Sequence, residues 1–282
     1  MNKFGGDWTK KKIEILVEYA KAYLKIMAKY PHFHLLYFDG FAGSGIIVKD
    51  KNIDIQLTIG AARRIVELDN PKQFDTYYFV EKVKKNADLL EKFTKYEFPQ
   101  KNILIVSEDC NLKLVDMAKY LKSPKGKDTK VLAYIDPCGM QLEWSSLQSL
   151  KSLNVDMWVL VPTGLGVNRL LNKNGNISTG WLKRLVKFLG MSEVEIKRYF
   201  YFTESIETLF GKEIHESKVK NAIEKSAILY RDRLNEIFSF VTLPFVLRNT
   251  KGTIMYHLFL ASNNKTATKI GNDIIKKFNR IN

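Results

Sequence analysis

The residues with the clearest chemical potential form a loop near the start of the chain, from Asp39 to Gly45. An apolar run at residues 35–38 leads into Asp39, and Gly40, Gly43 and Gly45 follow. An apolar strand that ends in such a turn is typical of a ligand-binding loop, because glycine takes positive φ and lets a ligand approach the main chain. The stretch predicts a nucleotide-cofactor loop at the carboxyl end of a strand, although an ordinary turn would use the same glycines.

The spacing of the glycines separates three kinds of cofactor loop. A dinucleotide fingerprint requires a third glycine three residues after Gly45, where this chain has Val48. A phosphate loop requires Gly-Lys-Ser/Thr, whereas Gly45 is followed by two isoleucines. The remaining pattern, an acid followed by Phe-Ala-Gly-Ser-Gly at residues 41–45, resembles motif I of class I S-adenosylmethionine-dependent methyltransferases. We therefore expect Asp39, Gly40 and Phe41 to contribute to the cofactor site together with Gly43 and Gly45.

A second candidate site is the tetrapeptide Asp136-Pro137-Cys138-Gly139, which follows an apolar run. It resembles motif IV of amino-methyltransferases, Asp/Asn-Pro-Pro-Tyr/Phe. In that motif the carboxylate or amide and a proline carbonyl accept hydrogen bonds from an amine, and the aromatic ring stacks on a flipped base. Asp136 and Pro137 are therefore the predicted catalytic residues, with a strand-ending turn as the alternative.

Cys138 and Gly139 replace the second proline and the aromatic residue of that motif, so a stacking ring would have to come from elsewhere. Trp8 and Trp144 are the candidates. No metal site is expected, because His32 and His34 make an incomplete ligand set.

Elements that could position these residues recur along the chain. Apolar runs at 35–38, 76–80, 103–106, 131–135 and 155–161 alternate with helical patterns, which predicts a parallel sheet covered on both faces.

An acid follows each of the first four runs: Asp39, Glu81, Asp109 and Asp136. All four should lie along the carboxyl edge, where such sheets bind ligands. Glu81 is placed to accept hydrogen bonds from ribose hydroxyls, and Asp109 with the Cys110 backbone to hold an adenine amine.

The predicted fold is α/β and Rossmann-like, with the seven-stranded mixed sheet of class I methyltransferases flanked by helices. Residues 1–163 and 217–282 would form this domain, and two closing antiparallel strands would lie at 238–247 and 255–261. A helix over 9–30 precedes the first strand and brings Lys12 near the cofactor edge. There Lys12 could bind the cofactor by reaching a carboxylate or phosphate, with a solvated lysine as the alternative. Residues 164–216 show helical patterns and turns, which predicts a helical insertion that caps the substrate.

Composition points to a polyanionic partner. The 282 residues carry 45 Lys and Arg against 30 Asp and Glu, a formal net charge of +15, which favours RNA or DNA through phosphate neutralisation. A basic protein that binds no polyanion is the alternative. Two cysteines are too few for a disulfide framework, and no apolar stretch is long enough to span a membrane, so we expect a cytoplasmic protein.

Motifs along nearly the whole chain resemble the three-Cys-motif partner (TcmP) family, which is grouped with class I methyltransferases. The resemblance is carried by Thr9-x-x-Lys12, the loop at 39–45, Asp109-Cys110-Asn111, Ile135 to Gly139, and Leu258 to Asn263. The helix and the glycine loop are more distantly similar to ribosomal-RNA adenine N6-methyltransferases of the RlmJ type. The family's Asp-Pro-Tyr-Gly has Cys138 in place of the tyrosine, and the resemblance implies a cognate three-Cys-motif partner protein.

These patterns favour an enzyme that transfers the methyl group of S-adenosylmethionine to an amine of a nucleic acid, with adenine N6 as the best candidate. One alternative is a module of the same fold that binds a nucleic acid or a protein without catalysis, which Cys138-Gly139 would suit. Another is a protein methyltransferase that acts on its partner.

Overall fold

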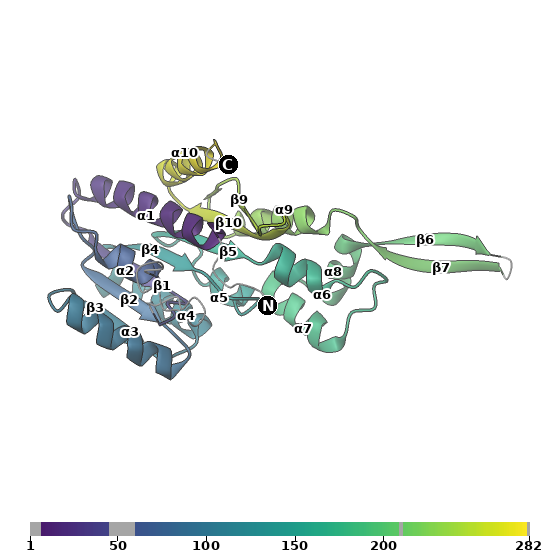
Figure 1. The fold of residues 1–282 in the computed structure, drawn as a ribbon, viewed down its shortest axis with the longest axis horizontal. Helices are drawn as coiled ribbons and strands as arrows, with labels where there is room; N and C mark the ends of the chain where they lie inside the picture. The colour runs from purple at the N-terminus through teal and green to yellow at the C-terminus, as the bar shows by residue number, and fades with distance from the viewer. Residues whose placement is uncertain (1–6, 45–59, 209–210, 281–282) are drawn as a thin grey trace.

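A central sheet of eight strands organises the molecule (Figure 1). The computed structural model describes residues 7–44, 60–208 and 211–280. In spatial order the strands are β3 (Ile103–Val106), β2 (Thr76–Val80), β1 (His34–Asp39), β4 (Thr129–Ile135), β5 (Val155–Val161), β10 (Ile254–Ser262) and β8 (Phe240–Val241), and β9 (Phe245–Arg248) also pairs with β10. Strands β1 to β5 are parallel, and β10 runs antiparallel to β5, β8 and β9.

Helices cover both faces of the sheet. One face packs against α1 (Asp7–Met27), α2 (Ala61–Val66), α3 (Lys84–Glu97) and α10 (Lys265–Arg280). The other packs against α4 (Cys110–Lys122), α5 (Trp144–Gln148) and α9 (Ala222–Leu234), and a 3-10 turn (Pro124–Gly126) follows α4. Because both faces are buried, the inner strands are almost continuously apolar, as in β4 and β5. The predicted doubly covered α/β sheet is confirmed.

The part of the sheet that is formed by the C-terminal strands differs from the prediction in one detail. A single strand was expected over 238–247, but β8 and β9 are separate. Between them Thr242 Oγ1 accepts a hydrogen bond from the backbone N–H of Leu260 at 3.0 Å, so a side chain replaces a backbone acceptor. Pro244 follows and has no N–H to donate, which interrupts the ladder. The sheet therefore has eight strands rather than seven.

The segment after β5 is helical only in its first part. A π-helical turn (Thr163–Val167) leads into α6 (Asn168–Leu170), α7 (Thr179–Leu189) and α8 (Glu193–Phe200). The expectation of a wholly helical insertion is wrong for the remainder, which forms an antiparallel hairpin of β6 (Tyr201–Thr208) and β7 (Gly211–Lys218). Beyond the buried Tyr201, most of the described side chains of this hairpin are exposed, so its sequence lacks the alternating apolar face by which strands are usually recognised.

Within the described portion, no helix is long and apolar enough to cross a membrane.

Candidate active site

The predicted acids do gather at the carboxyl edge of the parallel strands. Asp39 ends β1, Glu81 directly follows β2, Asp109 lies three residues after β3, and Asp136 directly follows β4. Strands β1, β2 and β4 are neighbours in the sheet, with Asp39 in register with Phe79 and Tyr134. The topology thus brings residues almost 100 positions apart to one rim.

The glycine loop owes its shape to two different constraints. A Cβ on Gly40 would lie 2.5 Å from the sulfur of Cys110 and 2.9 Å from Cδ1 of Ile135, so close packing requires glycine there. Gly43 has a φ of +65°, and none of the described residues comes within 4 Å of an added Cβ, so its backbone conformation rather than space requires glycine. The expectation that a ligand lies against the main chain at Gly43 stays a prediction.

Glu81 connects the glycine loop to the end of β2 through hydrogen bonds. Its Oε2 accepts a hydrogen bond from the N–H of Gly43 at 3.0 Å, and its Oε1 accepts one from the N–H of Val83 at 2.8 Å. A carboxylate can accept about four hydrogen bonds, so this one can also accept bonds from hydroxyl groups of a ligand. Its expected role toward a ribose stays a prediction.

Asp39 lies beneath the loop rather than on its surface. It is 2 % exposed, and its Oδ1 accepts a hydrogen bond from the N–H of Phe41 at 3.1 Å. Burial raises the pKa of this carboxyl to about 7, despite the opposing effect of the Phe41 N–H. Asp39 therefore stabilises the loop from beneath. The expectation that it faces the methionine part of a cofactor stays a prediction, and the burial of Asp39 does not favour it.

Asp136 is held by two partners from different elements. Lys12 of α1 donates to its Oδ2, and the hydroxyl of Tyr134 donates to the same oxygen at 3.0 Å. Lys12 is 7 % exposed, whereas the Asp136 side chain is 18 % exposed. In the described part of the chain both of these contacts go to Oδ2, and neither uses Oδ1.

An aromatic pair adjoins this ion pair. The rings of Trp8 and Tyr256 are stacked with centroids 5.3 Å apart, and the Lys12 ammonium lies 5.2 Å from the Trp8 ring. Burial and the nearby charge of Asp136 raise the pKa of Tyr256 to about 12. Trp8 is half-buried whereas Tyr256 is 5 % exposed, so the accessible part of the pair beside this ion pair belongs to the Trp8 ring.

Asp109 and Cys110 begin α4. Asp109 caps the helix, because its Oδ1 accepts from the N–H of Asn111 at 2.9 Å, and it also forms an ion pair with Lys82 at 3.0 Å. These contacts lower the pKa of Asp109 against the opposing effect of burial. Cys110 is buried, and burial raises the pKa of its thiol, so it is a packing residue rather than a nucleophile. A backbone role toward an adenine amine stays a prediction.

Two sequence candidates do not join this cluster. Trp144 is 2 % exposed and packs edge-on against Tyr230 in the core, so the expectation that it could stack on a base is wrong. Gly45 lies outside the described residues.

Sequence reasoning missed Tyr134 and Tyr256 as site residues. Tyr134 could have been found, since it precedes Asp136 by two positions and alternation along a strand puts both on one side. Tyr256 gives no such signal, because only the antiparallel return of β10 brings it near Asp136.

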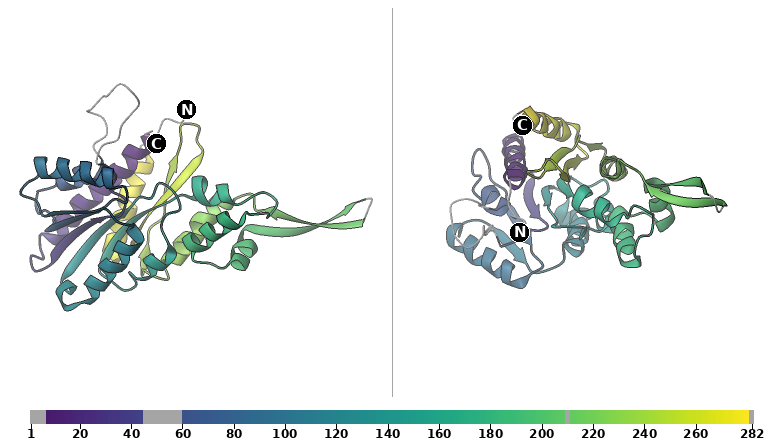
Figure 2. Two further views of the ribbon diagram at one scale, coloured as in Figure 1. Left: turned by 90° about the horizontal axis from the view of Figure 1, so that it is seen from below. Right: turned by 45° about the vertical axis from the view of Figure 1, so that its right-hand side comes forward.

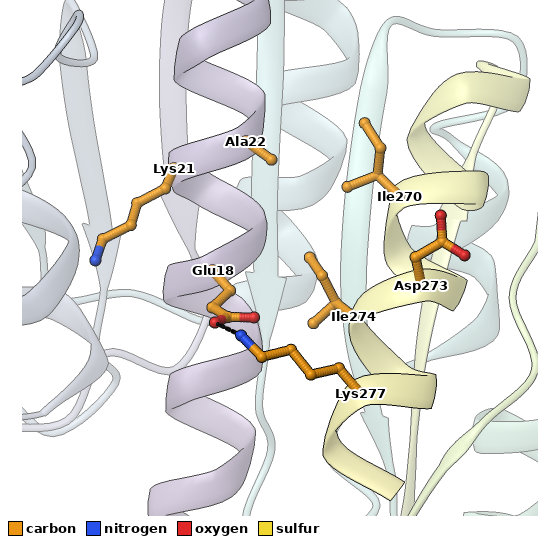
Figure 3. A pocket seen from close by; sticks show the side chains of 7 residues that line it. All are labelled: Glu18, Lys21, Ala22, Ile270, Asp273, Ile274 and Lys277. Atoms are coloured by element: carbon orange, nitrogen blue, oxygen red, sulfur yellow. Dashed lines mark hydrogen bonds and ion pairs between the residues drawn. The ribbon is translucent and has the colours of Figure 1, made fainter. Parts of the chain in front are cut away.

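Two hollows lie away from this rim. A groove of about 490 Å³ runs between α1 and α10, where Lys277 and Glu18 form an ion pair across it (Figure 3). A smaller cavity of about 140 Å³ at the opposite edge of the sheet is lined by Tyr23, Lys130 and Asp156. Asp156 is already bonded by Tyr19 and Ser262, which fixes α1 to β5 and β10. Neither hollow contains the predicted site residues.

The strand order, the antiparallel β10 and the ligand-facing rim define a Rossmann-like fold of the class I methyltransferase type. No protein-family model matches the chain, and no curated protein matches it.

Solved structures with a similar fold include protein LPL1258 from Legionella pneumophila, with 16% identity, 90% of this chain and 97% of that chain covered, and a TM-score of 0.40. Trm1 from Pyrococcus horikoshii, solved with S-adenosyl-L-methionine, has 11% identity over 93% of this chain and 65% of that chain, with a TM-score of 0.38. An S-adenosylmethionine-dependent methyltransferase from Clostridium acetobutylicum has 9% identity over 91% and 92%, with a TM-score of 0.36. Likenesses at this level say nothing of activity, which has to be argued from the site.

Proposed function

We propose that this protein is an S-adenosylmethionine-dependent methyltransferase that modifies an amine of RNA or DNA, with adenine N6 as the best candidate. The observation that carries the proposal is the anchoring of Asp136 through one oxygen by Lys12 and Tyr134. A carboxylate fixed in this way presents its second oxygen in a constant direction, which is what orienting an amine requires.

The rim fits the cofactor by the hydrogen-bond acceptor that it offers and by its shape. Glu81 offers a carboxylate for ribose hydroxyls, and Gly43 leaves open space beside the main chain. When bound, S-adenosylmethionine would supply a methyl group from its sulfonium and leave as the thioether S-adenosylhomocysteine. The amine nitrogen would form the new N–C bond and release one proton to the solvent.

The chain's own residues position the acceptor. Asp136 Oδ1 and the carbonyl of Pro137 would each accept a hydrogen bond from the amine, which holds its lone pair in a fixed direction. The Trp8 ring, which stacks on the buried Tyr256, would take the place of the aromatic residue that the motif has where this chain has Gly139, and would support a base beside Asp136. The net charge of +15 supports a nucleic acid as the substrate.

The proposal also includes the location and the partner of the enzyme, and it has two alternatives. The sequence motifs resemble the TcmP family, which supports a cytoplasmic enzyme that works beside a three-Cys-motif protein. The Cys138-Gly139 departure favours a second candidate, a non-catalytic module that binds the cofactor and a nucleic acid or a protein. Methylation of the partner protein is a third outcome that the same experiment distinguishes.

The test has two arms. Calorimetric titration of S-adenosylhomocysteine into the protein should release or absorb heat at one site, and its absence would overturn cofactor binding. Labelled methyl groups should then enter total RNA or DNA in a form that nuclease removes.

Asp136→Ala should abolish this incorporation while it retains S-adenosylhomocysteine binding, and Asp88→Asn on the exposed face of α3 is the matched control. Binding without incorporation would favour the non-catalytic module, and label removed by protease would favour the protein substrate.

A further inference from the structure

A long stretch of the chain after Asp156 carries positive charge only. Residues 157–192 contain no Asp or Glu but five basic residues: Arg169, Lys173, Lys183, Arg184 and Lys187. The stretch comprises most of β5, the π-helical turn, α6 and α7, and Figures 1 and 2 show its helices between the central sheet and the hairpin of β6 and β7. A basic segment without acids is the electrostatic feature expected of a surface that binds a polyanion.

The cations of α7 are not balanced within their own helix. Lys183, Arg184 and Lys187 are exposed, and Lys183 lies four positions before Lys187, a spacing that sets like charges side by side. In the described part of the chain Lys183 and Arg184 form no ion pair, and Lys187 forms one, with Glu143 at 2.7 Å. In α3, by contrast, two lysines each pair with an acid four positions away. The charge of α7 therefore does not stabilise the helix and is available to a ligand.

An exposed tryptophan adjoins these cations. Trp181 is 39 % exposed, and among the described residues no aromatic ring or cation stacks on its indole. Arg184 follows it by three positions, so the two side chains lie on one face of α7. Gly180 precedes them on the same face, and no described atom lies within 4 Å of the position that its Cβ would take. An open ring beside unpaired cations matches a nucleic-acid strand, because bases stack on aromatic rings while phosphates bind cations.

The basic segment lies directly against the stretch that follows Asp136. Lys187 of α7 pairs with Glu143, seven positions after Asp136. A Cβ on Gly166, in the π-helical turn, would lie 2.9 Å from Cγ of Met140. Two separate contacts thus place the segment beside the candidate catalytic loop, so a strand bound on α7 is close to the site where its base would be modified.

We propose that the exposed face of α7 binds the nucleic-acid strand that carries the methyl acceptor. This α7 surface consists of Trp181, Lys183, Arg184 and Lys187. Lys183 and Arg184 would bind phosphates and Trp181 would stack on one base, whereas Lys187 is shared with Glu143 and contributes less. Stacking on an indole requires an unpaired base, so the ligand is a single strand rather than a duplex. The inference rests on the proposed function, since it names the place where the substrate of that function binds.

Fluorescence anisotropy of a labelled RNA strand over a range of salt concentrations tests the role of charge. Lys183→Gln combined with Arg184→Gln removes two phosphate contacts, so the slope of log K against log[salt] should become shallower by about 1.4, at about 0.7 for each contact with a single strand. Affinity at low salt should fall about tenfold or more. Lys269→Gln combined with Lys276→Gln removes the same charge from exposed positions of α10, on the opposite face of the sheet, and should leave the slope unchanged.

The role of stacking needs a second variant. Trp181→Ala should weaken binding of the RNA strand, and of the same sequence as DNA, about tenfold without a change in the salt slope. A loss confined to the RNA strand would identify RNA as the ligand, and one confined to the DNA strand would identify DNA. The corresponding duplex should bind the wild type more weakly and should not respond to Trp181→Ala. Thermal melting that matches the wild type shows that each variant is folded.

Two results would overturn the inference while they leave the proposed function intact. One is equal loss of affinity in the α7 and α10 pairs of variants, and the other is an α7 pair that binds a strand as tightly as the wild type. Unchanged affinity in Trp181→Ala would remove the stacking contact. A wild-type protein that binds neither strand would overturn this inference together with the nucleic-acid substrate, and the α7 surface would then fit an acidic protein. Calorimetry with S-adenosylhomocysteine reports cofactor binding independently of all these results.

Discussion

Lys12, in the second turn of α1, forms an ion pair with Asp136, at the end of β4. The two residues are 124 positions apart, and Lys12 is nearly buried between the Trp8 ring and the carboxylate. The leading helix therefore does more than cover the sheet, because it supplies the cation that fixes the candidate catalytic group. Removing one member of a buried ion pair leaves the other uncompensated, which is costlier than the pair's own contribution.

The first prediction concerns this cation. Lys12→Met should destabilise the fold by about 3 kcal/mol, because it leaves the Asp136 carboxylate without its counter-charge in a partly buried site. It should also abolish methyl transfer. Lys12→Arg should recover part of both losses, since a guanidinium keeps the charge. Urea unfolding and labelled-methyl incorporation measure the two effects. Lys10→Met is the matched control on the exposed side of α1, and equal losses in both variants would refute a specific role for Lys12.

The second prediction concerns the loop anchor. Glu81→Gln exchanges a carboxylate that accepts from Gly43 and Val83 for an amide with one acceptor oxygen, so one N–H loses its partner. Hydrogen bonds to a charged group contribute about 1.5 to 3 kcal/mol, which corresponds to roughly a tenfold or greater loss of S-adenosylhomocysteine affinity. Calorimetry measures this change. Glu97→Gln, which loses a surface contact with Arg63, should bind as the wild type does, and unchanged affinity in Glu81→Gln would remove Glu81 from the site.

The sequence predicted those parts of the fold that local pattern determines. The apolar runs of β1 to β5 and the acids that follow them mark the carboxyl rim, because burial on both faces forces continuous apolar strands. The same reasoning located Glu81 and Asp136 correctly at that rim. It could not distinguish the buried Asp39 from the accessible Asp136, since both follow strands in the same way. Their difference comes from the contacts of Phe41 and Lys12, which only the folded chain brings together.

Sequence patterns did not predict the features that depend on contacts between distant parts of the chain. Trp144 carries the residue type expected of a stacking platform, yet α7 buries it: a Cβ added to Gly190 would lie 2.1 Å from its ring. Beyond the buried Tyr201, most of the described side chains of the hairpin are exposed, so its sequence has no apolar face and its residues resembled loop and helix ends. Tyr256 is beside Asp136 only because β10 returns antiparallel to β5.

The third prediction concerns the close packing beneath the glycine loop. Gly40→Ala should destabilise the protein by about 1 to 3 kcal/mol, because the new methyl group would lie 2.5 Å from the Cys110 sulfur. Cys110→Ala removes that sulfur, so the double variant should lose less stability than the sum of the two single variants. The contact with Ile135 keeps the rescue partial. A double-mutant cycle by urea unfolding measures the coupling, and strict additivity would show that the two positions do not touch.

The fourth prediction concerns pH. The pKa of Asp39 is about 7 in the folded protein because of burial, against an ordinary value of 3.8. Between these values the folded state retains a proton that the unfolded state has released, so this group's contribution to stability falls as the pH rises from about 4 to about 7. Asp39→Asn carries no such proton and keeps an acceptor for the Phe41 N–H. The variant should therefore gain stability relative to the wild type as the pH is raised through that range.

Urea unfolding of both proteins at pH about 5 and about 8 measures this difference, which should reach a few kcal/mol in favour of Asp39→Asn at the higher pH. Asp156 is another buried carboxyl whose pKa burial raises, but it is present in both proteins. Its effect on the free energy of unfolding cancels in the comparison. The change with pH in the stability difference between the two proteins therefore reports Asp39 alone. If the two stability curves ran parallel across this range, Asp39 would have to be ionised in the folded protein, and the loop would rest on a buried charge stabilised by Phe41 and Lys12.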